Sequence, residues 1–112
     1  MARRSEAPES ALRLLGLAAR AGAIVPGTER VREAARSGRL HFTWVAADAA
    51  ANAMDKLIPL LVARGVPHAV VGNRVELGAA VGRAPLSAIG VMDASFAKRL
   101  RDMIGDRSEQ DM

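Results

Sequence analysis

Helical and strand-like segments alternate along this 112-residue chain, and this alternation constrains the fold more than any other feature. Amphipathic or Ala-rich helical patterns cover about 11–20, 28–37, 50–64, 73–81 and 94–104, and β-branched or aliphatic runs cover about 40–47, 68–71 and 86–92. Strands that are joined through helices build a mostly parallel sheet with helices on both faces. We therefore predict an α/β fold, a three-layer α/β/α sandwich around a small, mostly parallel mixed sheet.

Short polar side chains mark the expected helix ends. Ser10 is placed to cap the first helix, and Asn73 with Glu76 matches a capping box at the start of the fourth. Asp48 and Asp93 each follow a predicted strand, where carboxylates can serve an active site or cap the next helix. Capping is the simpler interpretation for both carboxylates.

The length suits a single domain, which can bury about two thirds of its unfolded surface without a metal or disulfide. We expect this domain at 11–104, after a disordered lead-in or linker at 1–9 and before a polar tail at 105–112. The apolar residues 23–25 form a bridge between the first two helices. Pro59 is expected to kink or interrupt the third helix.

The residue types present argue against an enzyme. The chain has no Cys and no Tyr, and its two histidines, His41 and His68, lack partners at the spacing of a metal site or catalytic set. The segment Gly78–Gly82 lacks the Lys and Ser/Thr of a phosphate-binding loop. We therefore predict no catalytic residues, no metal and no cofactor, and a small enzyme or nucleotide-binding domain is disfavoured.

The hydropathy of the chain predicts where in the cell the protein is located. No run reaches the ~18 apolar residues of a membrane span, and the start lacks a clean apolar signal region. We expect a cytoplasmic protein without a membrane partner.

The net charge of +4 is concentrated in the first third of the chain. Residues 1–40 contain eight Arg and four Glu, whereas the remainder is neutral. On the second helix Arg32, Arg36 and Arg39 fall at i, i+4 and i+7, an arrangement that suits phosphate groups or equally a solvated helix face. Only 3% of residues are aromatic, which argues against RNA-binding modes that stack bases on an aromatic platform.

The order and spacing of several short motifs resemble the ribosomal protein L7Ae superfamily, in particular its short bacterial, YlxQ-like branch. The matching segments are Leu14–Gly22, Gly27, Arg36–Arg39, Asp48 with Asn52, Leu77–Gly78 with Gly82, and Asp93–Ala97. The resemblance covers about residues 11–104. It implies an α/β/α sandwich, in agreement with the pattern above.

The resemblance also implies binding to structured RNA, either ribosomal RNA or a kink-turn, through the N-terminus of the second helix and the loop before the last strand. A helix N-terminus offers free N–H groups and a positive dipole to phosphate. The RNA-binding residues implied are Gly27, Thr28, Glu29, Arg30, Arg32 and Arg36 in the first segment, and Arg83, Ala84, Pro85 and Leu86 in the second. The implied partners include the ribosome or a translation factor, and in some bacteria a second small domain, fused or paired.

One family signature is altered here. Kink-turn binders carry Asn, Glu and Lys where this chain has Glu29, Arg30 and Glu33, although Gly27 matches and Arg30 and Arg32 keep the segment basic. The altered signature leaves a second hypothesis open, a protein-interaction module on the same fold that has lost specific RNA readout.

Overall fold

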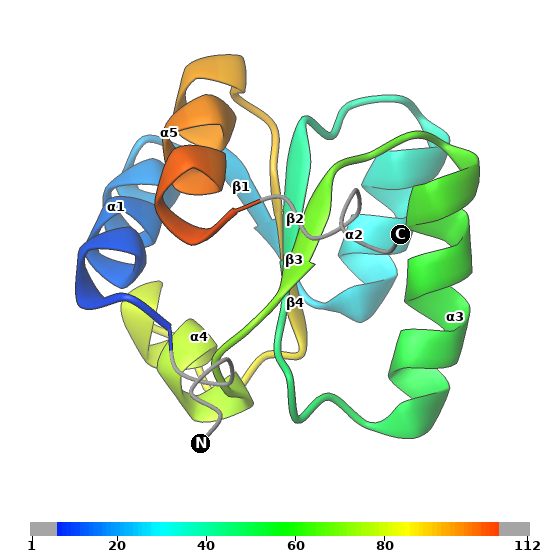
Figure 1. Cartoon of the computed structure of the whole chain (residues 1–112), viewed down its shortest axis with the longest axis horizontal. Helices are drawn as coiled ribbons and strands as arrows, with labels where there is room; N and C mark the ends of the chain where they lie inside the picture. The colour runs from blue at the N-terminus through cyan, green and yellow to red at the C-terminus, as the bar shows by residue number, and fades with distance from the viewer. Residues whose placement is uncertain (1–6, 106–112) are drawn as a thin grey trace.

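The computed structural model describes residues 7–105, which fold into five helices and a four-stranded sheet (Figure 1). The helices are α1 (Glu9–Arg20), α2 (Thr28–Arg36), α3 (Ala51–Ala63), α4 (Arg74–Ala80) and α5 (Ala94–Ile104). The strands are β1 (Ile24–Pro26), β2 (Phe42–Val45), β3 (His68–Val70) and β4 (Ala88–Val91). None of the helices within 7–105 is both long and apolar enough to cross a membrane.

The predicted three-layer α/β/α sandwich is confirmed. Helices α1, α4 and α5 cover one face of the sheet, and α2 and α3 cover the other (Figure 1). Side chains alternate between the two faces along β2, so that Phe42 and Trp44 pack under α1 and α5 while Val45 packs under α2 and α3. This central strand is buried on both faces, which explains its apolar and β-branched composition.

The sheet is mixed, but the expectation that it is mostly parallel is wrong. The strand order is β1-β4-β2-β3, and only β2 and β3 run parallel, whereas β4 is antiparallel to both β1 and β2. Residues 24–26, expected to be a bridge, form the edge strand β1. Three residues are too few to show a strand period, and their pairing with β4 creates the element.

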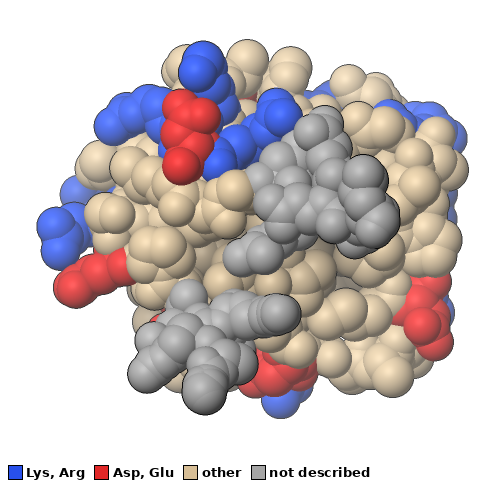
Figure 2. Space-filling view, viewed as in Figure 1, with Lys and Arg blue, Asp and Glu red and all other residues tan. Residues whose placement is uncertain are grey.

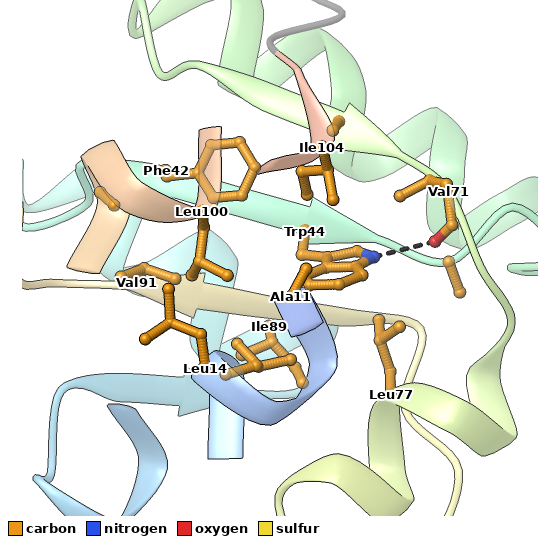
Figure 3. Packing of buried hydrophobic residues seen from close by; sticks show 14 residues of the cluster. Ala11, Leu14, Phe42, Trp44, Val71, Leu77, Ile89, Val91, Leu100 and Ile104 are labelled. Atoms are coloured by element: carbon orange, nitrogen blue, oxygen red, sulfur yellow. Dashed lines mark hydrogen bonds between the residues drawn. The ribbon is translucent and has the colours of Figure 1, made fainter. Parts of the chain in front are cut away.

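The core on the first face is built around Trp44, which is fully buried (Figure 3). Its indole Nε1 donates a hydrogen bond of 2.8 Å to the carbonyl of Val71, and the ring packs among aliphatic side chains from four other elements. A buried indole needs such a partner for its N–H. The low aromatic content therefore suffices for the core, because Trp44 and Phe42 are both fully buried in it.

Several predicted helix ends are confirmed and others are wrong. Asn73 and Glu76 form the capping box of α4, and Asp93 caps α5 through the backbone N–H groups of Ser95 and Phe96. Helix α1 begins at Glu9 after Pro8, so Ser10 lies inside the helix and is not its cap. The rest of the proposed lead-in, 1–6, and the tail from 106 lie outside the described residues.

Pro59 was expected to kink or interrupt α3, and it does not interrupt the helix, which runs from Ala51 to Ala63. Pro59 is exposed, as is Asp55, the residue whose carbonyl loses its helical hydrogen-bond partner. The helix keeps its buried contacts through Leu57 and Leu61, on the face that covers the sheet.

Candidate nucleic-acid interface

Three helices begin at one edge of the sheet. Val45 lies opposite both Val70, at the end of β3, and Ala88, at the start of β4, and β1 ends there too because Pro26 pairs with Ile89. Helices α2, α3 and α4 start just after these strand ends, at the lower edge in Figure 1. Their positive dipole ends therefore point to the same side of the molecule.

Gly27 shapes the entry to α2. Its φ of 98° is in the region that glycine alone adopts without strain, and its N–H donates to the carbonyl of Ala88 at a distance of 2.8 Å. No side chain of the described residues caps this helix, so the N–H groups of Thr28 and Glu29 keep no intrahelical partner. The first turn of α2 therefore presents free donors, whereas α4 and α5 have their first turns capped.

The segment 82–87 ends beside this helix entry, because Ala88 directly follows it. The Arg83 N–H donates to the carbonyl of Gly78 at 2.8 Å, and the Leu86 N–H donates to that of Arg74 at 3.1 Å. A methyl group at Gly78 would collide with the carbonyls of Arg83 and Ala84, so the close packing of the loop on α4 requires glycine there. Arg83, Ala84 and Pro85 are exposed, and Leu86 packs partly against the core.

Asp48 connects the segment after β2 to the first residue of α4 rather than capping the helix that follows it. Its Oδ1 accepts a 2.9 Å hydrogen bond from the Arg74 N–H, and its Oδ2 lies 3.7 Å from the Arg74 Nε. Helix α3 begins after Ala50 without a side-chain cap. The prediction that Asp48 caps α3 is therefore wrong. The contact of Arg74 with Asp48 was not predicted, because no local sequence pattern indicates it.

The positive charge of the α2 entry is partly neutralised within the helix. Arg32 donates to both carboxylate oxygens of Glu29, at 3.0 and 3.3 Å, and its side chain is only 22% exposed. Its buried Nε has no hydrogen-bond partner among the described residues. Arg30 and Arg83 are exposed and pair with no carboxylate of 7–105, which makes them the available cations of this edge.

The structure separates Arg36 from the other predicted contacts. It is the last residue of α2, and nine helical residues span about 13 Å, so its backbone lies at the opposite end of the helix from Thr28. The helix ends before Arg39, which lies in the connection to β2, so the predicted row of three arginines is not a single helix face. Gly27 contacts Ala88, the residue directly after the segment 82–87, and Arg32 lies one turn further along α2.

The two histidines lie apart from this edge. His68 is buried at the start of β3, where its Nδ1 is 3.2 Å from the carbonyl of Val66, and His41 is exposed before β2. Among residues 7–105 no group of three or more His, Asp or Glu side chains could hold a metal ion.

The chain is similar in sequence to two curated bacterial proteins. It is 31% identical over 91 residues to the "RNA-binding protein YlxQ" of Bacillus subtilis, covering 81% of this chain and 91% of that protein. It is 29% identical over 96 residues to the protein of the same name from Enterococcus faecium, covering 86% and 92%.

Solved structures share the fold. A Bacillus halodurans protein of unknown function superposes with a TM-score of 0.82 at 37% identity, covering 87% of this chain and 98% of that one. The Giardia lamblia 15.5kD RNA binding protein superposes with a TM-score of 0.72 at 21% identity, covering 94% and 95%. The model of the ribosomal protein L7Ae/L30e/S12e/Gadd45 family matches residues 9–101. The chain belongs to this family, and the resemblance found in its sequence is confirmed.

Proposed function

We propose that this protein is a non-enzymatic RNA-binding protein that recognises structured RNA through the α2 surface. We define this surface as Gly27–Arg30 with Arg83–Leu86. The observation that carries the proposal is the uncapped first turn of α2, with exposed Arg30 in it and exposed Arg83 in the segment that leads to Ala88. The names of the two curated relatives support the same partner class.

The chemistry of the α2 surface suits a sharply bent RNA backbone. The free N–H groups of Thr28 and Glu29 lie at the positive end of a helix dipole, where phosphate oxygens bind favourably. Arg30 and Arg83 can each grip a phosphate in a bidentate fashion. The exposed Ala84 and Pro85 offer an apolar surface against which an unstacked base can lie. A kink-turn provides such a base.

The loop 82–87 contributes to RNA affinity because its conformation is already fixed before RNA binds. The loop 82–87 is anchored to α4 by backbone hydrogen bonds, and Ser87 accepts from the Ala46 N–H at 2.8 Å. A surface that is already ordered loses little conformational entropy when RNA binds. Because Glu29 neutralises Arg32, we infer that most of the electrostatic attraction comes from Arg30 and Arg83.

The test is a salt titration of RNA affinity. Binding of a kink-turn hairpin, a plain hairpin and duplex DNA would be measured between 50 and 300 mM salt. Two to three phosphate contacts predict that log K falls with log salt at a slope of about −1.4 to −2.7. The double substitution Arg30→Gln with Arg83→Gln should remove most of this slope. Arg13→Gln with Lys56→Gln removes the same charge from exposed positions elsewhere and should leave RNA binding nearly unchanged.

The outcomes separate the two hypotheses that the sequence left open. Binding of the kink-turn hairpin above both controls would support structured-RNA recognition, and cosedimentation with ribosomes would then test the association with translation. Absence of binding to every RNA would refute the proposed function. A partner that stays bound after nuclease treatment would in that case favour the protein-interaction module.

A further inference from the structure

The edge of the sheet opposite the α2 surface carries a second concentration of arginine. Helices α1, α2 and α3 end at this edge, each with an arginine at its end, and Arg39 follows α2. The residues concerned are Arg20, Arg36, Arg39 and Arg64. Figure 2 shows Lys and Arg gathered along the upper side of the molecule, where these helices end and α5 begins, and few along the lower side.

Three of these arginines converge on the end of α2. The Nη1 of Arg64, which follows α3, donates a hydrogen bond of 2.9 Å to the backbone carbonyl of Arg36. The Nε of Arg39 lies 3.0 Å from the Oγ of Ser37, the C-cap residue of the same helix. All three side chains belong to exposed residues, so the cluster faces solvent.

This cluster lacks the carboxylates that accompany other surface cations. Within 7–105 the pairs Arg13–Glu9, Arg74–Asp48 and Lys98–Asp102 are ion pairs, whereas Arg36, Arg39 and Arg64 pair with no carboxylate. The carboxylate of Asp93 is at the same edge, but its Oδ1 already accepts hydrogen bonds from the first turn of α5.

Helix capping explains only part of the cluster. A cation near a helix C-terminus contributes about 0.3–1 kcal/mol, and the hydrogen bond from Arg64 to the Arg36 carbonyl already fills that role. Adding Arg36 and Arg39 beside it places like charges together, which opposes folding unless an anion compensates them. The cluster is therefore better suited to an external polyanion than to stabilising the helix.

We propose that Arg36, Arg39 and Arg64 form a second surface that binds the phosphate backbone of duplex RNA without reading its sequence. The proposal rests on the RNA-binding function proposed above and adds a distinct contact to it. Guanidinium groups bind phosphates in a bidentate fashion, and no aromatic side chain lies in the cluster to stack on a base. Because α2 is about 13 Å long, the two surfaces lie at opposite ends of this helix. The protein would thus contact a bent motif with one edge and an RNA helix with the other.

The test compares two probes and two variants. The probes are a short kink-turn hairpin and a plain 24-base-pair RNA duplex without a bulge. Arg36→Gln with Arg39→Gln should weaken duplex binding at least about five-fold at 100 mM salt and make its salt slope shallower by about 1.4 to 1.8. The same variant should bind the kink-turn hairpin within two-fold of the wild type. Arg30→Gln with Arg83→Gln should show the reverse pattern.

Two controls separate charge from structure. Arg36→Lys with Arg39→Lys keeps the charge and should retain most duplex binding, and Arg13→Gln with Lys56→Gln should match the wild type. Thermal melts followed by circular dichroism would show that each variant is folded.

The outcomes also distinguish this inference from the proposed function. Failure of the wild type to bind the plain duplex, or binding that Arg36→Gln with Arg39→Gln leaves unchanged, would overturn the second surface while leaving the α2 surface intact. Loss of binding to poly-glutamate, but not to the duplex, in that variant would also overturn it, in favour of an acidic protein partner. Failure to bind the kink-turn hairpin alone would refute only the α2 surface.

Discussion

Gly78→Ala is the substitution that most directly connects packing to the α2 surface. Gly78 lies inside α4, where alanine would by propensity add about 1 kcal/mol of stability. Its added methyl group, however, would lie 2.8 Å from the carbonyl oxygen of Arg83 and collide with the carbonyl of Ala84. Both are backbone atoms, so the loop 82–87 must move as a unit.

The expected magnitude follows from these contacts. Overpacking costs about 1–3 kcal/mol, and losing the hydrogen bond from the Arg83 N–H to the Gly78 carbonyl costs about 1 kcal/mol more. After the gain in propensity, the free energy of unfolding should fall by about 1–3 kcal/mol, which lowers Tm by about 4–12 °C in a domain of this size. Displacing Arg83 removes one charge-assisted contact of about 1.5 kcal/mol, so the Kd for a kink-turn hairpin should rise about ten-fold.

Gly82→Ala is the matched control at the start of the same loop. Gly82 has a φ of 73°, so alanine there costs about 1–2 kcal/mol of backbone strain, but its methyl group would meet no atom within 4 Å. Its Tm should fall while its RNA affinity stays within two-fold of the wild type. Calorimetry and fluorescence anisotropy would supply the two measurements. A wild-type Tm in Gly78→Ala, or equal losses of affinity in both variants, would refute the reasoning.

Three further outcomes are expected. Glu29→Gln releases Arg32 from its ion pair. RNA should then bind several-fold more tightly in a filter-binding titration, with a salt slope steeper by about one, and weaker binding would contradict this. Thr43 is fully buried and its hydroxyl has no hydrogen-bond partner among the described residues. Thr43→Val should therefore raise the free energy of unfolding, measured in urea, by about 1 kcal/mol. A decrease would show that the hydroxyl has a hydrogen-bond partner. The Phe96 N–H and the Ser95 hydroxyl lower the pKa of Asp93 below its usual 3.8, so its stabilisation is present above about pH 4 and lost as pH falls through the lowered pKa. Asp93→Asn should therefore make stability less dependent on pH below 4 in acid melts, and an unchanged acid limb would contradict this.

Local chemistry was predictable wherever the interaction spans only a few residues. The Asn73 and Glu76 capping box and the Asp93 cap are confirmed because each connects groups at most three residues apart. The edge strand β1 was missed because its three residues carry no period, and only the pairing with β4 defines them. The roles of the candidate site residues remain predictions, and the structure places only Gly27 directly against Ala88, the residue after 82–87.

The positions of the charged residues also show which properties local sequence predicts and which depend on the fold. Counting along the sequence located the excess positive charge in the first third and put Arg32, Arg36 and Arg39 in one row. The structure pairs Arg32 with Glu29, ends the helix at Arg36 and brings Arg64 to that end from a helix further along the chain. A side chain's neighbours across the fold decide whether its charge is available, and helical spacing alone cannot reveal them.

Periodicity, capping and short motifs act over short stretches of chain, so they predict the layered α/β architecture, the family and the general positions of the helices. The direction of β4 and the contact of Gly27 with Ala88 arise only in the assembled fold. The first depends on the register in which Val45 lies opposite Val70 and Ala88, and the second on the register in which Pro26 lies opposite Ile89. Such pairing is selected by the burial of both sheet faces at once, a property of the assembled fold rather than of any one segment.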